Sequence, residues 1–179
     1  MTDPDTVRRF EALVLPHMHS AYDFARWLTH NDQDARDIVQ DAFLRAFRFF
    51  DGFHGSDARP WLLSIVRNTF YTWYEQNRMY CARAEVFDEV IHGQSLDATA
   101  VSNDPEALLI RRERNAQVAG AVRQLRIEYR EVIVLRELED LAYREIANIV
   151  GVPIGTVMSR LARARQQLAA LLVETDREG

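Results

Sequence analysis

The stretch LAYREIANIVGVPIGTVMSRLARARQQLAALL, residues 141–172, decides the fold of the C-terminal part of this chain. On both sides of Gly151 its apolar residues recur at the three- and four-residue spacing of a helix. A short helix, a glycine turn and a longer second helix form the helix-turn-helix pattern, in which the second helix enters a groove of DNA. The segment therefore predicts a DNA-binding module.

The second helix of this segment has two distinct faces. At about 100° per residue, one face carries the apolar residues Val157, Leu161, Ala164 and Leu168. The opposite side carries the polar and cationic residues Thr156, Ser159, Arg160 and Arg163. Such side chains reach bases and phosphates, so this side is the candidate duplex-binding site. A merely solvated amphipathic helix shows the same pattern, but the absence of any acid between Glu145 and Glu174 favours DNA.

Beyond this segment, helical spacing continues over almost the whole chain and predicts an all-α protein. The exception is residues 85–103, which are polar, small and aperiodic, and longer than a routine connection within one domain. We interpret this segment as a flexible linker. The sequence thus predicts two small helical domains, residues 1–84 and 104–179, joined by that linker.

The predicted helix at residues 35–50 places a leucine on its polar side. Val39, Ala42, Phe43 and Ala46 share the inner face at about 100° per residue. The outer side carries Leu44, surrounded by Asp37, Gln40, Asp41 and Arg48. An apolar centre with a polar rim is typical of a small protein-binding surface, although a single exposed leucine is also common on any soluble protein.

The next predicted helix begins at Pro60, a residue suited to a first helical turn. The apolar residues in the first part of this helix are candidates for the core. Residues 67–74, further along it, mix aromatic rings with amide and hydroxyl groups. Such mixtures suit single-stranded DNA, because unstacked bases lie on aromatic faces. Burial in the core is the equally simple alternative for Trp73 and Tyr74.

The composition excludes several classes of protein. The net charge of −5 speaks against a protein that coats nucleic acid through bulk charge. One cysteine, Cys81, allows no internal disulfide, and His17 and His19 point to different faces of a helix, so we expect no metal site. We find no catalytic constellation and expect no enzyme activity, no cofactor and no membrane insertion. The expected location is the cytoplasm.

Two groups of residues carry a family resemblance. The segment YREVIVLRELEDLAYREIANIVGVPIGTVMSRLARARQQLAALL, residues 129–172, resembles region 4 of the extracytoplasmic-function group of sigma-70 factors. The segments ARDIVQDAFLRAFRFFDGF, residues 35–53, and ARPWLLSIVRNTFYTW, residues 58–73, resemble region 2 of the same family. Two positions depart from the family pattern: Arg126 stands where proline is usual, and Met158 stands where lysine or arginine is common.

The resemblance implies a sigma factor that directs core RNA polymerase to promoters and is controlled by an anti-sigma factor in a stress or envelope response. It implies that the helix at 35–50 contacts the clamp helices of the largest polymerase subunit, through Asp37, Gln40, Asp41, Leu44 and Arg48. It implies that the −10 element is melted and read by a second group, for which the candidates are Phe53, His54, Arg67, Asn68, Tyr71 and Trp73. It further implies that the −35 duplex is contacted by Thr156, Ser159, Arg160 and Arg163.

Two other functions remain open from the residues alone. A stand-alone helix-turn-helix regulator with an N-terminal sensor or dimerisation domain would bind its duplex specifically without polymerase. A helical enzyme or adaptor would need a ligand pocket, for which the sequence offers no residues.

Overall fold

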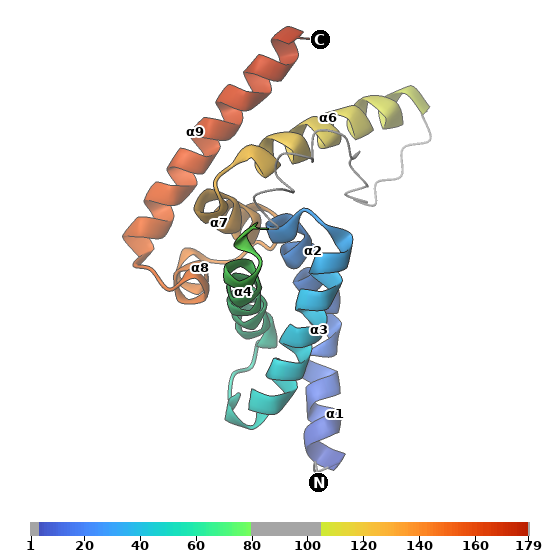
Figure 1. Cartoon of the computed structure of the whole chain (residues 1–179), viewed down its shortest axis with the longest axis vertical. Helices are drawn as coiled ribbons and strands as arrows, with labels where there is room; N and C mark the ends of the chain where they lie inside the picture. The colour runs from blue at the N-terminus through green and yellow to red at the C-terminus, as the bar shows by residue number, and fades with distance from the viewer. Residues whose placement is uncertain (1–3, 80–104, 179) are drawn as a thin grey trace.

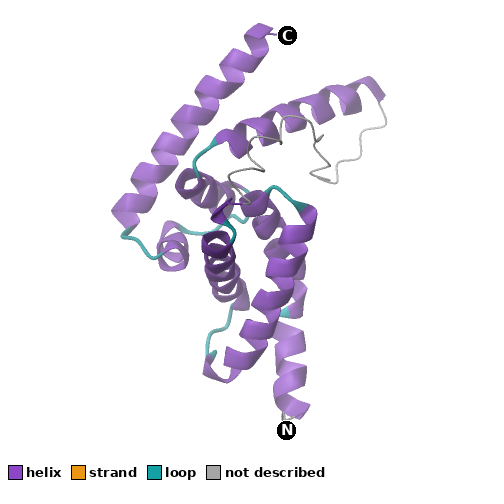
Figure 2. Ribbon diagram, viewed as in Figure 1, coloured by secondary structure: helices purple, strands orange, loops and turns teal. Residues whose placement is uncertain are grey.

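The computed structural model describes residues 4–79 and 105–178, and the predicted linker 85–103 lies outside this part of the chain. The described residues form helices, turns and loops without a strand (Figure 2), which confirms the all-α prediction. The N-terminal helices are α1 (Pro4–Leu13), the short 3-10 helix η1 (Leu15–His17), α2 (Met18–Thr29), α3 (Asp32–Phe49), the 3-10 helix η2 (Phe50–Gly52) and α4 (Ala58–Gln76). The C-terminal helices are α6 (Pro105–Gln124), α7 (Ile127–Glu137), α8 (Tyr143–Val150) and α9 (Ile154–Glu178).

Helices α2, α3 and α4 pack against one another as a bundle, with α1 running beside α3 (Figure 1). Helix α3 begins at an N-cap, where the Asn31 side chain accepts hydrogen bonds from the backbone N–H groups of Gln33 and Asp34. The small inner residues Ala35, Ala42 and Ala46 are completely buried, so neighbouring helices approach α3 closely. The bundle therefore follows from the periodicity and the cap that the sequence shows.

The C-terminal part contains the predicted helix-turn-helix, formed by α8 and α9. Gly151 ends α8 with a left-handed backbone, φ 70°, and its N–H donates to the carbonyl of Ala147 at 2.9 Å. Glycine adopts this conformation without the steric cost that a side chain brings. Val157, Leu161 and Ala164 are at most 1% exposed, which confirms the apolar stripe of α9.

The two parts pack against each other, with α7 on α2 and α8 on α4 (Figure 1). Buried residues of both parts belong to one continuous hydrophobic core. The sequence contains no signal for this contact, and the division into residues 1–84 and 104–179 stays a prediction. Helices α6 and α9 extend beyond the packed region in a V shape, which leaves much of their length exposed.

A histidine sits among arginines where the two parts meet. His30 ends α2 with φ 58°, and its Nε2 is buried without a hydrogen-bond partner among the described residues. Arg130 of α7 donates to the carbonyls of Arg123 and Leu125 at 2.8 Å each and reaches Leu28 at 3.5 Å. Burial, together with the charges of Arg130, Arg123 and Arg26, lowers the pKa of His30 to about 3.

This low pKa predicts an acid-sensitive fold. Because the folded pKa of about 3 lies below the ordinary value of 6.5, the contribution of His30 is complete above pH 6.5 and is lost as the pH falls towards 3. Between pH 7 and pH 5 we expect the free energy of unfolding to fall by about 2 kcal/mol more in the wild type than in His30→Asn. Asparagine tolerates the left-handed backbone and carries no titrating group. Urea denaturation at both pH values measures this difference, and equal losses in the two proteins would contradict the assignment.

Candidate functional site

The outer side of α3 exposes the leucine that the sequence singled out. Leu44 is 63% exposed, whereas Val39 on the inner side is 8% exposed, so the predicted facing of the helix is confirmed. Asp37, Gln40 and Arg48 are exposed around it. Asp41 is half-buried and accepts a hydrogen bond from Arg45 Nε at 3.0 Å. The candidate polymerase-binding residues thus share one surface, apart from the carboxylate of Asp41, which is already paired.

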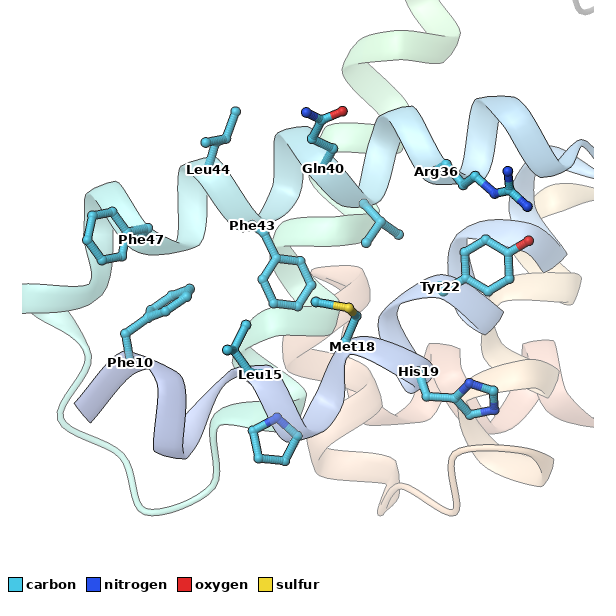
Figure 3. A pocket seen from close by; sticks show the side chains of 12 residues that line it. Phe10, Leu15, Met18, His19, Tyr22, Arg36, Gln40, Phe43, Leu44 and Phe47 are labelled. Atoms are coloured by element: carbon cyan, nitrogen blue, oxygen red, sulfur yellow. The ribbon is translucent and has the colours of Figure 1, made fainter. Parts of the chain in front are cut away.

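Beside this surface lies an apolar groove between α3 and the junction of α1 with α2 (Figure 3). Its volume is about 970 Å³. Figure 3 shows Phe43 pointing toward Met18, while Leu44 and Gln40, which also line the groove, project outward from α3 at its edge. The helical periodicity predicts an inner, core-facing position for Phe43 and gives no indication of the groove. The available signal was an excess of apolar residues over what one buried face needs: Phe10, Leu15, Met18, Phe43 and Phe47 all line it.

The candidate −10 residues differ in their accessibility. His54 and Asn68 are exposed, and Trp73 is half-buried against Phe70, with ring centroids 6.1 Å apart. Phe53 is only 6% exposed and stacks on Phe50 and Trp61. The ring of Phe53 is therefore part of the core and is not available to a base in this structure.

Two further candidates, Arg67 and Tyr71, point from α4 into the contact with the C-terminal part. Arg67 donates from Nε and Nη2 to the two oxygens of Glu131, at 2.7 Å and 3.1 Å. The Tyr71 hydroxyl donates to the same carboxylate at 3.1 Å. Burial, with the charge of Glu131, raises the pKa of Tyr71 to about 12. Burial acts to lower the pKa of Arg67, but the bond to Glu131 outweighs it and raises the pKa overall.

The candidate −35 residues on α9 also differ in their accessibility. Ser159 and Arg163 are exposed, and Thr156 is half-buried. The Arg160 side chain is 25% exposed, and its Nη1 lies 3.5 Å from Glu131 Oε1. The structure thus brings Arg160 together with Arg67 and Tyr71, which the sequence had assigned to a different DNA element.

The outward face of α9 contains a residue that the sequence analysis treated only as a family departure. Met158 is 53% exposed and lies near the exposed Gly155 and Ala162. These three positions are separated by three and four residues, the spacing of one helical face, so the periodicity could have placed Met158 there. Small residues at 155 and 162 leave the Met158 side chain prominent on the outward face of α9.

Neither a metal-binding cluster nor a membrane-spanning helix is found in the described part of the chain. No group of three or more His, Cys, Asp or Glu side chains in residues 4–79 and 105–178 is placed to hold a metal ion. Within the same residues, no helix combines the length and the apolar character that crossing a bilayer requires.

Comparison with known proteins locates both segments in one family. Residues 13–79 match the model for sigma-70 region 2, and residues 116–168 match that for sigma-70 region 4. The RNA polymerase sigma-H factor of Pseudomonas aeruginosa is 31% identical over 178 residues, which cover 96% of this chain and 90% of the relative. The ECF RNA polymerase sigma-E factor of Escherichia coli K12 is 33% identical over 164 residues, covering 90% of this chain and 85% of the relative.

Solved structures give the same result. The sigma factor RpoE of Bartonella quintana, in complex with the anti-sigma factor NepR, aligns with a TM-score of 0.72 at 28% identity, covering 92% of this chain and 97% of that chain. CnrH in complex with the cytosolic domain of CnrY aligns with a TM-score of 0.64 at 27% identity, covering 93% and 89%.

The facing of α3 predicts opposite effects for two glutamate substitutions. Val39→Glu places an unpaired carboxylate in the core and should destabilise the fold by about 3 kcal/mol or more. Leu44→Glu adds a charge to an exposed position and should change stability by no more than about 0.5 kcal/mol. Thermal unfolding followed by far-UV circular dichroism compares the two, and comparable destabilisation by Leu44→Glu would show that this side of α3 is covered.

Proposed function

Because the chain belongs to the extracytoplasmic-function group of the sigma-70 family, we propose that it binds core RNA polymerase through α3 and directs initiation at promoters with matching −10 and −35 elements. The observation that carries this function is that the region 2 and region 4 matches occur together, in order, in one chain. Nearly the whole chain aligns with relatives named as sigma factors. A stand-alone regulator would account for the helix-turn-helix but not for the region 2 match.

The polymerase-binding surface in this proposal is centred on Leu44. A leucine that is 63% exposed, flanked by Gln40 and Arg48, offers the apolar centre and polar rim of a small interface. We assign it to the clamp helices of the largest polymerase subunit. The adjacent groove supplies further apolar area, so a helix lying across α3 could contact both.

Promoter recognition is divided between the two parts of the chain. For the −10 strand we propose the exposed His54 and Asn68 together with Trp73, and, once they are released from Glu131, Arg67 and Tyr71. Phe53 joins this group only if its ring leaves the core. For the −35 duplex we propose the α9 residues Thr156, Ser159, Arg160 and Arg163.

The proposal includes regulation by an anti-sigma factor. Two structural relatives were solved with anti-sigma factors or with the cytosolic domain of a partner protein, and both align over more than nine tenths of this chain. We propose an anti-sigma partner that covers the polymerase-binding and DNA-binding surfaces until a stress or envelope signal releases it. The protein acts in the cytoplasm, where the polymerase is.

Run-off transcription with purified core polymerase tests the function. On templates carrying candidate promoters, we expect transcripts of defined length only when the chain and core polymerase are both present. Specific duplex binding by the chain alone, with no transcript from any template, would favour the stand-alone regulator instead.

The polymerase contact predicts a selective defect for Leu44→Glu. A charge at the centre of an interface removes a hot spot worth about 2 kcal/mol, so affinity for core polymerase should fall about 30-fold. The matched control is Leu138→Glu, which changes another exposed leucine, 47% exposed, at the end of α7. Fluorescence anisotropy with labelled chain measures both affinities. Equal affinities of the two variants would exclude this surface as the docking site.

The −35 contact predicts a defect for Arg163→Ala. Arg163 is exposed on α9, and a bidentate contact with guanine is worth about 1–3 kcal/mol. Arg165→Ala is the control, since Arg165 lies two residues further along the helix and donates to Glu137 at 2.7 Å. Initiation should fall at least fivefold for Arg163→Ala, about the factor that 1 kcal/mol gives, and only on promoters that depend on the −35 element. Normal initiation by Arg163→Ala on such promoters would show that this residue does not read the duplex.

A further inference from the structure

The contact between the two parts of the chain is organised around one buried carboxylate. Glu131 of α7 has no exposed surface. It accepts hydrogen bonds from Arg67 and Tyr71 of α4 and lies 3.5 Å from Arg160 of α9. A buried carboxylate without partners is strongly unfavourable, so its burial depends on these three side chains.

All three partners of Glu131 belong to the proposed DNA-binding residues, and they come from different promoter elements. Arg67 and Tyr71 are assigned to the −10 strand, and Arg160 is assigned to the −35 duplex. Centres of the two elements are about 25 base pairs apart, which is about 85 Å at about 3.4 Å per base pair. Arg67 and Arg160 both lie within 3.5 Å of the same carboxylate, so they cannot reach the two elements at once in this conformation.

The contact of Arg67 with Glu131 has the same chemistry as a contact between arginine and a DNA phosphate. Arginine binds carboxylate and phosphate with the same two-pronged geometry, and Arg67 uses both Nε and Nη2 on Glu131. The Arg67 guanidinium also lies over the Tyr71 ring, 4.5 Å from its centroid, which holds both side chains toward α7. The Glu131 carboxylate therefore gives Arg67 the same kind of contact that a DNA phosphate would give.

We propose that Glu131 is an autoinhibitory latch that holds the −10-binding and −35-binding residues together in the free protein. This proposal rests on the proposed function, because it uses the DNA-binding roles assigned to Arg67, Tyr71 and Arg160. Opening separates α4 from α7 and α8, and breaks the bonds that Arg67 and Tyr71 make with Glu131. It also removes the weaker contact of Arg59 with Glu139, whose charged atoms are 3.9 Å apart. Binding of the N-terminal part to polymerase, with the C-terminal part held at a distant duplex, favours the open form.

The test compares Glu131→Gln with Glu137→Gln, using the full chain without polymerase. Glutamine keeps the size of the side chain and removes the charge that holds Arg67. Glu137 is the matched control, because it also lies on α7 and pairs with an α9 arginine, but within the described residues it forms no hydrogen bond or ion pair with α4. Small-angle X-ray scattering should show a larger radius of gyration for Glu131→Gln only. Its affinity for a −35 duplex should rise about tenfold, the factor that corresponds to 1.4 kcal/mol.

A second variant keeps the test valid if Glu131→Gln fails to fold by far-UV circular dichroism. Arg67→Gln removes the two charged hydrogen bonds from α4 and, among the described residues, leaves only the Tyr71 hydroxyl donating to Glu131 across the contact. It keeps Glu131 paired with Arg160 within the C-terminal part. We expect Arg67→Gln to expand as well, and no DNA measurement is needed for it. A radius of gyration equal to that of the wild type in the folded variant would overturn the latch.

Failure of the latch can be told apart from failure of the proposed function. The radius of gyration involves neither promoter nor polymerase. Wild-type chain that directs run-off transcription while Glu131→Gln stays compact would overturn the latch and leave the sigma-factor function standing. Expansion of Glu131→Gln without transcription by either protein would support the closed contact and contradict the proposed function.

Discussion

The carboxylate of Glu131 constrains the arrangement of the whole molecule, because a charge with no access to water must be met by cations from the surrounding helices. Arg67 comes from α4 and Arg160 from α9, so satisfying this one group requires the N-terminal bundle and the helix-turn-helix to lie against α7 together. The neighbouring apolar contacts of α2 with α7 and of α4 with α8 then close one continuous core. Since a buried ion pair often stabilises a structure little in net terms, such a contact suits the interface that we propose to open.

Most of what the periodicity predicted lies within single helices. The facing of α3 and the stripe of α9 follow from local spacing, which side-chain burial obeys wherever one face meets the core. Phe53 illustrates a local failure, since a loop residue has no period to indicate that its ring folds back onto Phe50 and Trp61. The pair of Arg67 with Glu131 illustrates a non-local one, because the two residues are 64 positions apart and nothing in either segment specifies the other. The family resemblance indicates the function. It does not indicate which of the expected DNA-contacting residues are already bonded to other residues of the same chain.

Polymerase binding and promoter binding make different demands on this structure. The surface around Leu44 lies on the outer side of α3 and is exposed in the closed arrangement, so docking does not require the two parts to separate. The side chains of Arg67, Tyr71 and Arg160 are half-buried and bonded to Glu131 in the closed arrangement, and in our proposal they are released when α4 leaves α7 and α8. Our proposal therefore implies an order of events, in which the polymerase-binding surface is available first and Arg67, Tyr71 and Arg160 are released second.

The charge of the chain favours the same order. With 27 acidic against 22 basic residues, the free protein carries a net charge of −5, and long-range attraction to DNA is absent. Binding to a duplex then depends on a small number of placed side chains, of which the closed form has already committed Arg160 to a carboxylate of its own. The net negative charge alone would leave some affinity for DNA, since salt screens the repulsion between the protein and DNA. The contact of Arg160 with Glu131 alone would also leave some affinity, since exposed groups such as Arg163 remain free of α4. Together they make recognition conditional on a partner that contributes its own affinity and holds the two parts at the separation of the promoter elements.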